Sequence, residues 1–342
     1  MPNLAITASG MVTALGFNSR SSCAAMRAGI RGVTQSYLWD DESGEYLGAG
    51  KVHLPHWWHN ISKLADLVTP AIQECLEAAA PTLGSKIPIL LGISNRLDDS
   101  NVVEIINEIQ VRLGFQLHPA SELIVRDHIS VAIGLQKSKE ILSQGHARYC
   151  IVAGVDSLID QDLAERFLSQ RRLLTPINSN GFVSGEAGSA VLVCESDIQV
   201  NELEILGIGI SREDSLIESE APLRGEGLIR ALAQAFQEAG LALDDLHYRI
   251  TDLNGEHYRF KEMAFAMMRC ERKPKPKLFE LWHPIEYVGD IGAAIGPILL
   301  GVALHASRME YGVGPKILLT CANDDGERMA IVARFCTGEN QL

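Results

Sequence analysis

Gly181-Phe-Val-Ser-Gly-Glu-Ala-Gly-Ser-Ala-Val-Leu-Val193 is the most informative stretch of the chain, because three glycines are followed at once by an apolar run. Such a segment predicts a turn that leads into a buried strand. It lacks the Gly-Lys-Ser/Thr ending of a phosphate-binding loop and does not run into a helical pattern, so we do not expect it to bind nucleotide phosphates. We expect Glu186 to anchor the turn.

Composition limits the kinds of protein that this chain can be. It has 342 residues, 46% of them hydrophobic and 21% charged, which indicates a globular protein with one large domain or two packed ones. Its formal net charge of −13 argues against binding nucleic acid or an anionic membrane, because both require a clustered positive surface. No uninterrupted apolar run of about 18 residues is present, so we expect no membrane span.

The amino terminus and the cysteines bear on the cellular compartment. The chain becomes strand-like directly after Met1 and lacks the features of a secretory signal. Seven cysteines are scattered without the CxxC spacing of metal or redox motifs. This usage is typical of a reducing compartment, and we expect a soluble cytoplasmic protein without structural disulfides.

Short apolar or β-branched runs alternate with helical patterns along the chain, which predicts an α/β protein with buried sheets. The predicted helices are 64–79, 130–143 and 227–239, the last of them ended by Gly240. The predicted strands are 3–8, 87–93, 149–153, 189–194, 204–210, 248–253, 316–321 and 329–335.

The strand pattern divides near residue 200, with four predicted strands on each side. Each group ends in a pair of strands that we expect to form an antiparallel edge. We therefore predict two similar α/β units, residues 1–200 and residues 201–342, although the two halves of the sequence are not visibly similar.

The segment 181–193 resembles the GFV-x-GEGAG-x-LVL signature of β-ketoacyl synthases, the condensing enzymes of the thiolase fold. Further segments resemble motifs of the same family in the correct order, and together they span nearly the whole chain. The resemblance implies a thiolase-like, five-layer αβαβα fold built from two similar halves. The segments are 6–16, 26–32, 145–156, 221–232 and 289–296.

The resemblance also locates the position of the family's nucleophile. Ketosynthases use a cysteine at the amino terminus of a buried helix, where the helix dipole and backbone N–H groups lower the pKa of the thiol. Here that helix is 130–143. Counting back from Gly145 places His128 at the cysteine position, whereas anchoring on 132–134 places Arg126 there. Neither alignment yields a cysteine.

The remaining catalytic positions also differ from the family pattern. The first family histidine falls on Asp252, with Asn254 and Glu256 close behind, and the second falls on Asp290 in the segment that resembles GH-x-x-GAAG. The supporting lysine corresponds to Ile285. By this resemblance the chain lacks the Cys–His–His set.

The glycine-rich loop near the carboxyl end is altered too. The family's GFGGTN loop corresponds to 323–328, which keeps a single glycine and can no longer approach a ligand with bare backbone. Cys321 precedes this loop, at a place similar to that of the second, base-like cysteine of thiolases. It is a candidate reactive thiol, with burial as a small hydrophobic side chain as the alternative.

The residues at the altered positions suggest acid–base chemistry. In a conserved fold His128, Asp252 and Asp290 would converge in one pocket, where the carboxylates raise the pKa of the histidine for use as a general base. The alternative is a self-satisfied polar cluster that fills a former active site. Glu256 and His257 are candidates for an acid–base pair, or for a cation site together with Asp252. The alternative is a polar turn at the start of a helix.

We expect neither a metal nor a cofactor. His53, His56 and His59 recur at every third position, but Pro55 between them forbids a regular helix. No cysteine or carboxylate completes a zinc site there. We expect an exposed loop or a flap that contacts a partner.

Two classes of function fit these residues. The first is a divergent acyltransferase-type enzyme acting on thioesters of acyl carrier protein or coenzyme A, in which His128, Asp252, Glu256 and Asp290 stand in for the usual residues. The second is a catalytically silent partner, similar to chain length factors, that shapes the product of a neighbouring synthase. A tunnel leading to these residues favours the first class, and bulky side chains that fill it favour the second.

The resemblance implies a dimer. The run 122–125 fits the edge strand through which family members pair, and an unpaired apolar edge would be an association hazard. We expect a homodimer, or a heterodimer with an active ketosynthase-like subunit.

Overall fold

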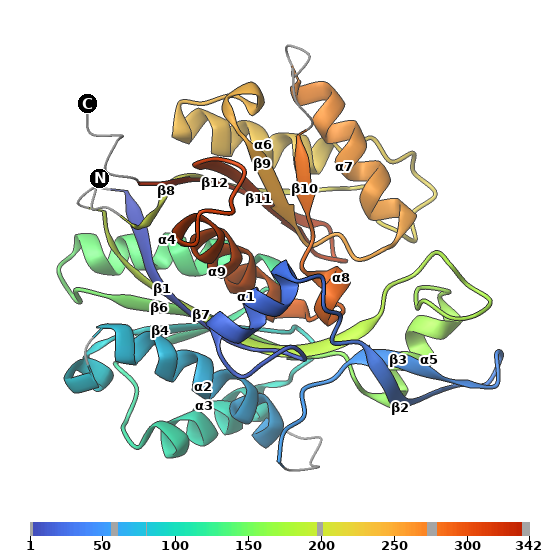
Figure 1. The fold of residues 1–342 in the computed structure, drawn as a ribbon, viewed down its shortest axis with the longest axis horizontal. Coiled ribbons are helices and arrows are strands. Elements are labelled where there is room, and N and C mark those ends of the chain that lie inside the picture. The colour runs from blue at the N-terminus through green and yellow to red at the C-terminus, as the bar shows by residue number, and fades with distance from the viewer. Residues whose placement is uncertain (1–2, 56–60, 80, 197–200, 272–278, 337–342) are drawn as a thin grey trace.

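The computed structural model describes residues 3–55, 61–79, 81–196, 201–271 and 279–336. Figure 1 shows sheets and helices stacked in layers, with helices between the sheets and on their outer sides. Within the described residues, no helix combines the length and the apolar character needed to cross a bilayer.

Ten strands of the described chain follow one continuous path, β10-β9-β11-β12-β8-β1-β7-β6-β4-β5. A hairpin of β2 and β3 joins this path where Ala49 pairs with Ser184 of β7. The strands are β1 (Leu4–Val12), β2 (Thr34–Asp40), β3 (Glu45–Gly50), β4 (Ile89–Ile93), β5 (Glu122–Val125), β6 (Cys150–Ser157), β7 (Ser184–Glu195), β8 (Leu203–Arg212), β9 (Tyr248–Thr251), β10 (Glu280–Trp282), β11 (Lys316–Ala322) and β12 (Glu327–Phe335).

The path consists of two halves with the same pairing pattern. One half is β1-β7-β6-β4-β5 and the other is β8-β12-β11-β9-β10. In each half the first two pairings are antiparallel and the last two are parallel. The strands β1 and β8 meet in antiparallel pairing and join the halves. This pattern supports the division near residue 200, which stays a prediction.

Helices separate and cover the two sheets. The helices α4 and α9 lie between them, since α9 contacts β1, β7 and β11 and α4 contacts β4, β6 and β8. On the outer faces, α2 packs on β1 and β7 with α3 against it, and α6 packs on β8 and β12 with α7 against it. The order of layers is therefore αβαβα, as predicted. The helices are α1 (Ser19–Arg27), α2 (Ile61–Ala79), α3 (Asp99–Leu113), α4 (Ser130–Ser143), α5 (Gln161–Ser169), α6 (Glu226–Ala239), α7 (His257–Cys270), α8 (Ile285–Val288) and α9 (Ile295–Arg308).

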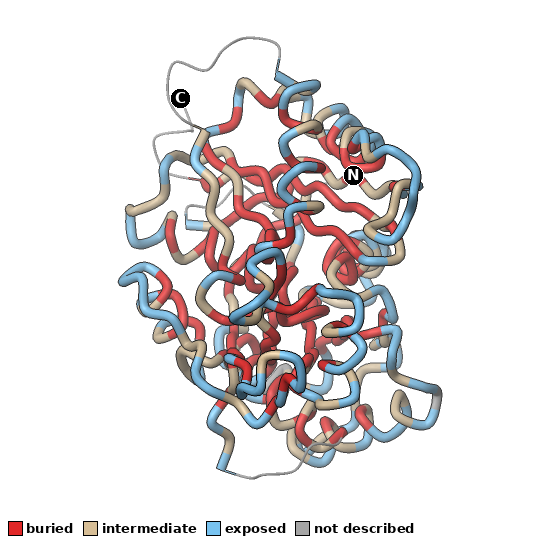
Figure 2. Tube along the Cα trace, turned by 90° about the vertical axis from the view of Figure 1, so that its right-hand side faces the viewer, coloured by how far each residue is buried: buried red, intermediate tan, exposed pale blue. Residues whose placement is uncertain are grey.

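The core runs through both sheets and the helices between them, and Figure 2 shows the buried segments gathered in the interior of the molecule. The helix α9 is buried along nearly its whole length. A helix that is apolar all round has no polar face and hence no amphipathic period, which is why its sequence shows no helical pattern.

The predicted strands and helices are all present, with shifted ends. Gly240 ends α6 in a left-handed conformation with a φ of 64°, as predicted. The pairs β6-β7 and β11-β12 are antiparallel, but the prediction that they form edges is wrong, because β7 also pairs with β1 and β12 also pairs with β8. The short strands β2, β3 and β10 were not predicted.

The glycine-rich motif 181–193 is not a turn followed by a strand. Gly185 and Gly188 already lie inside β7, and close packing requires both of them. A Cβ on Gly185 would lie 2.3 Å from the carbonyl oxygen of Val288, and one on Gly188 would lie 2.1 Å from that of Leu67. The glycines therefore let neighbouring backbones approach the two faces of the strand.

The prediction that Glu186 anchors a turn is wrong. Glu186 lies within β7, fully buried, and forms an ion pair with Lys63 of α2. Its carboxylate also accepts hydrogen bonds from Val52 N at 3.0 Å and from Ser157 Oγ at 2.8 Å. A buried carboxylate requires such partners, and here they link α2, β6 and the segment after β3 to β7.

Candidate functional site

A tight turn before α4 carries His128. The turn is the 3₁₀ segment Asp127–Ile129, which connects β5 to α4. Asp127 has a φ of 43°, an uncommon value for a residue with a Cβ and one that often marks functional sites. Ser130 Oγ donates a hydrogen bond to the carbonyl oxygen of Ile124 at 3.1 Å and secures the start of the helix.

The start of β7 holds the turn that carries Asp290. The Asp290 N–H donates to the carbonyl oxygen of Val183 at 2.7 Å, and the Gly185 N–H donates to the carbonyl oxygen of Asp290 at 2.8 Å. Gly289 and Gly292, on either side, have φ values of 79° and 50°. The glycine-rich motif therefore positions a carboxylate that lies far away in the sequence.

His128 and Asp290 meet, as the sequence predicted. His128 Nε2 lies 3.1 Å from Asp290 Oδ1, and Asn254 Nδ2 donates to Asp290 Oδ2 at 2.8 Å. Burial alone would lower the pKa of His128, but Asp290 and, more weakly, Asp252 raise it to about 9. Against the effect of burial, His128 holds the pKa of Asp290 below its usual range. The two groups are therefore an ion pair at neutral pH.

Asp252 lies behind this pair at the end of β9. Its Oδ2 accepts a hydrogen bond from the Ala322 N–H at 2.7 Å and lies 3.9 Å from Arg259 Nη1. Burial raises the pKa of Asp252, and Arg259 and His128 oppose that rise. Asp252 ties β9 to β11 and does not line the pocket that His128 and Asp290 line.

Glu256 and His257 have different partners. Glu256 is buried and forms a bidentate ion pair with Arg172, whose Nε and Nη2 lie 2.7 and 2.9 Å from its two carboxylate oxygens. His257 is exposed at the start of α7, and its backbone N–H donates to Asn180 Oδ1 at 2.8 Å. A polar turn at a helix start, the alternative considered above, describes this segment.

Three charged side chains that the sequence analysis missed complete the site: Arg172, Arg259 and Asp324. Asp324 accepts two hydrogen bonds from Arg172, at 2.7 and 3.0 Å, and one from Arg259 at 2.7 Å. Burial would raise the pKa of Asp324, but Arg259 and Arg172 lower it to about 2. The three residues come from the segment before β7, from α7 and from the β11-β12 turn, so no local spacing signals their proximity.

Of the two residues aligned with the family cysteine, His128 is the one that reaches Asp290. Arg126 points the other way, and its Nη1 lies 2.6 Å from Glu327 Oε1 with more than half of the side chain exposed. Because the turn between them is tight, the side chains of Arg126 and His128 have different partners.

Cys321 is buried in β11, away from the pocket lining. Burial and, more weakly, the nearby Asp252 carboxylate raise the pKa of its thiol well above the usual range. A thiol that stays protonated is a poor nucleophile, so this geometry favours the role of a small packed side chain.

The pocket at the site has a volume of about 220 Å³. Aromatic rings and ion-paired guanidinium groups form much of its wall. The rings of Phe167 and Phe182 pack edge to face, 5.0 Å apart, and Arg172 lies over both of them. The residues that line the pocket are Asn95, Arg96, Asp127, His128, Leu158, Arg166, Phe167, Arg172, Phe182, Arg259, Asp290, Gly292, Asp324 and Asp325.

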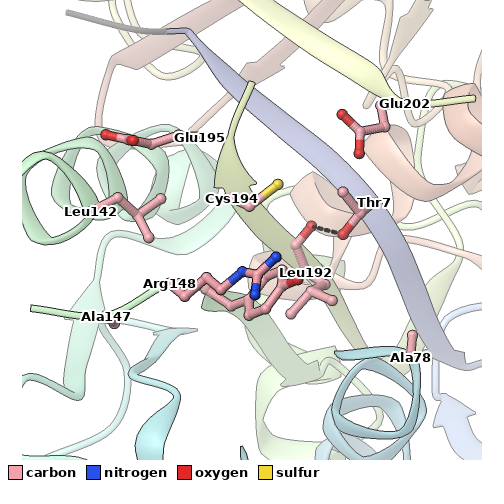
Figure 3. A pocket seen from close by; sticks show the side chains of 10 residues that line it. Thr7, Ala78, Leu142, Ala147, Arg148, Leu192, Cys194, Glu195 and Glu202 are labelled. Atoms are coloured by element: carbon pink, nitrogen blue, oxygen red, sulfur yellow. Dashed lines mark hydrogen bonds between the residues drawn. The ribbon is translucent and has the colours of Figure 1, made fainter. Parts of the chain in front are cut away.

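A wider pocket of about 470 Å³ lies elsewhere, beside β1 and β7 and near the ends of α2 and α4. Figure 3 shows Arg148 and Cys194 on one side of it, with Thr7 and Glu202 across from them. None of the site residues predicted from the sequence lines this pocket.

Within the described residues, no group of three or more His, Cys, Asp or Glu side chains is arranged to hold a metal ion. Of the histidines near Pro55, His53 is described, whereas His56 and His59 lie outside the described residues. That the protein needs neither metal nor cofactor stays a prediction.

No family model matches the sequence, and no curated protein does either. Solved structures do match. One is the complex of the ketosynthase ApeO with its chain length factor ApeC from Xenorhabdus doucetiae, with a TM-score of 0.76 and 14% identity over 98% of each chain. This chain has the thiolase-like fold of ketosynthases.

Two further structures with this thiolase-like fold cover almost the whole chain. The ishigamide ketosynthase/chain length factor matches with a TM-score of 0.71 and 15% identity, over 97% of this chain and 99% of that one. The ketosynthase AntDE, solved with the acyl carrier protein AntF, matches with a TM-score of 0.78 and 12% identity over the same shares. The fold predicted from the motifs is confirmed.

Proposed function

We propose that this chain is a non-condensing, ketosynthase-like subunit, comparable to a chain length factor, in fatty-acid or polyketide-type metabolism. The observation that carries the proposal is the turn before α4. There His128 is ion-paired with Asp290, and no cysteine lies at the amino terminus of the helix. A protonated imidazole has no lone pair with which to accept an acyl group, so the turn offers no nucleophile for condensation.

The packing around this turn supports the same proposal. Arg172 is engaged by Glu256 on one edge and by Asp324 on the other, beside Phe167 and Phe182. Separating the buried carboxylate of Glu256 from Arg172 costs several kcal/mol, so this wall resists displacement by an entering acyl chain. The carboxylates of Glu256 and Asp324 are thus engaged by arginines rather than presented to a substrate.

The edge strand β5 is the proposed dimer contact. Within the described residues it pairs with β4 on one side only, and its last residue, Val125, is 40% exposed. An uncovered edge of this kind favours pairing with another chain. We propose that its partner is a ketosynthase-like subunit or a second copy. The ketosynthase–chain length factor complexes and the carrier-protein complex among the similar structures support a heterodimer that meets an acyl carrier protein.

One observation favours a second function, acyl transfer on thioesters of coenzyme A or of a carrier protein. His128 lines the pocket, and its Nδ1 is buried without a hydrogen-bond partner among the described residues. A histidine with a pKa of about 9 carries a proton there at neutral pH. Such a group could protonate or polarise a substrate carbonyl without forming a covalent intermediate.

Intact-mass spectrometry combined with an assay of coenzyme A release separates these functions. The full chain is incubated with acetyl-, malonyl- and octanoyl-coenzyme A. A non-condensing subunit gives neither an adduct nor release above background. Release without an adduct, with water as the acceptor of the acyl group, that is lost in His128→Gln supports acyl transfer instead. An adduct on the wild type that is absent from Cys321→Ala overturns the proposal that no nucleophile is present.

Sedimentation tests the β5 contact. We expect Val125→Lys to shift the chain towards the monomer, or to weaken its capture of a co-expressed ketosynthase, because a charged side chain blocks pairing at an edge. Val111→Lys is the matched control, since Val111 is exposed on α3. Equal behaviour of the two variants would contradict the proposed contact.

A further inference from the structure

A third pocket, of about 290 Å³, lies between α1, β10, α8 and α9. It shares no lining residue with the pocket at His128. Its volume corresponds to about ten water molecules, enough for a small organic ligand. The walls are mostly apolar and aromatic, formed by Cys23, Met26, Leu281, Trp282, Pro284, Tyr287, Val302 and Tyr311.

Neighbouring aromatic rings hold Trp282, in the wall of this pocket, in place. The ring of Trp282 lies 4.7 Å from that of Tyr248, which is fully buried in β9. The Trp282 ring also lies 6.1 Å from the ring of Tyr311, with the two planes 23° apart. Rings that are held by such neighbours need little reordering when a ligand binds, which lowers the entropic cost of binding.

One cation at the rim of this pocket has no acidic partner. Arg27 is the last residue of α1, and its guanidinium carbon lies 4.4 Å from the ring centroid of Tyr311. Glu286 is the carboxylate among the pocket's lining residues, and Arg31 engages it at 2.5 Å. Within the described part of the chain Arg27 is thus a positioned donor without a carboxylate.

The surroundings of Arg27 are positive although the chain as a whole carries −13. His305 Nδ1 lies 3.2 Å from the hydroxyl of Tyr311. Burial lowers the pKa of His305, and Arg20, Arg27 and Arg308 lower it further. The same positive charges that disfavour protonation of His305 attract an anion.

We propose that this pocket binds a small hydrophobic monocarboxylate, such as a medium-chain fatty acid or an arylalkanoic acid. Its apolar body lies against Trp282 and Val302, and its carboxylate pairs with Arg27. A neutral ligand would gain no charge pairing with Arg27, which is exposed at the rim, and a ligand with two charges finds no second free cation among the lining residues that the structure describes. The planar guanidinium suits a bidentate carboxylate. The site is independent of the proposed function, because it uses none of the same side chains.

Calorimetric titration with octanoate, 4-phenylbutyrate and 1-octanol tests the charge requirement. We expect both carboxylates to bind and 1-octanol to bind at least tenfold more weakly. Arg27→Gln should lower the affinity for octanoate by about tenfold, because it removes one charge-assisted hydrogen-bond pair. Arg148→Gln, the same change at an arginine that also lies over a tyrosine ring but lines the 470 Å³ pocket, should leave the affinity within about twofold. Equal binding of octanoate and 1-octanol, or no effect of Arg27→Gln, overturns the proposal.

Methyl NMR of a methionine-labelled chain tests the location. Met26 is buried against the pocket, whereas Met268 is 73% exposed on α7. Octanoate should shift the Met26 methyl signal and leave that of Met268 in place. The shift should persist in His128→Gln, which separates this pocket from the site of the proposed function. Octanoate that binds without moving the Met26 signal, or that does not bind at all, overturns the assignment.

Discussion

His128 Nε2 lies 3.1 Å from Asp290 Oδ1, although the two residues are 162 positions apart in the chain. His128 enters from the turn before α4, and Asp290 enters from a turn that β7 holds by backbone hydrogen bonds. The pair therefore links the segments that precede α4 and α9, the two helices between the sheets. It is also the ionic contact on which the proposed function depends.

This pair predicts a pH dependence of stability. The pKa of folded His128 is raised to about 9, so its stabilising effect is complete below its unfolded pKa and is lost as the pH rises towards 9. We expect the wild type to lose on the order of 2 kcal/mol between pH 6.5 and 9 relative to His128→Gln. Urea unfolding of both chains across this range measures the difference. Parallel stability curves would contradict the ion pair.

The network around Arg172 predicts a large difference between two neighbouring arginines. Arg172→Met removes the bidentate partner of the buried Glu256 and leaves it the longer contact to Arg259 Nε at 3.9 Å, and we expect a loss of about 3 to 5 kcal/mol in the free energy of unfolding. Arg171→Met removes an exposed ion pair with Glu42 and should cost less than about 1 kcal/mol. Urea unfolding at pH 7 compares them, and similar losses would show that Arg172 is not a buried anchor.

The close approach at β7 predicts that Gly185 tolerates no side chain. Gly185→Ala places a methyl group 2.3 Å from the carbonyl oxygen of Val288, next to the turn that carries Asp290. We expect a loss of at least about 2 kcal/mol in the free energy of unfolding, because the backbone of β7 and the backbone at Val288 must move apart. In the control Gly48→Ala the nearest atom is a side-chain methyl of Val33 at 3.1 Å, which can move. Thermal unfolding by circular dichroism measures both, and a stable Gly185→Ala would refute the packing argument.

The burial of Cys321 predicts resistance to alkylation. Burial and the nearby Asp252 raise the pKa of its thiol, so the native chain should not be modified at Cys321 by iodoacetamide at pH 8. The same cysteine should react once the chain is unfolded in urea. Peptide mass spectrometry, with Cys321→Ala to assign the peptide, gives the extent of modification. Rapid labelling of the native chain would restore Cys321 as a candidate nucleophile.

Much of the fold could be predicted, because strands such as β6 and β12 are continuous apolar runs whose character depends on local sequence. The helix α9 could not, since a helix buried on all sides carries no amphipathic period. Glu186 was misplaced for a related reason. A carboxylate in the middle of a buried strand contradicts local patterning and is tolerated only because Lys63, from another element, pairs with it.

The sequence by itself determined the layered α/β architecture, and it placed Asp290 opposite either His128 or Arg126, since both follow from local patterns and from the order of the motifs. Only the tertiary structure decided that Arg126 faces away and that Arg172 closes on Glu256 and Asp324. The reason is physical. The pattern of a strand or a helix depends on a few neighbouring residues, whereas a buried ion pair depends on partners that only the folded chain brings together.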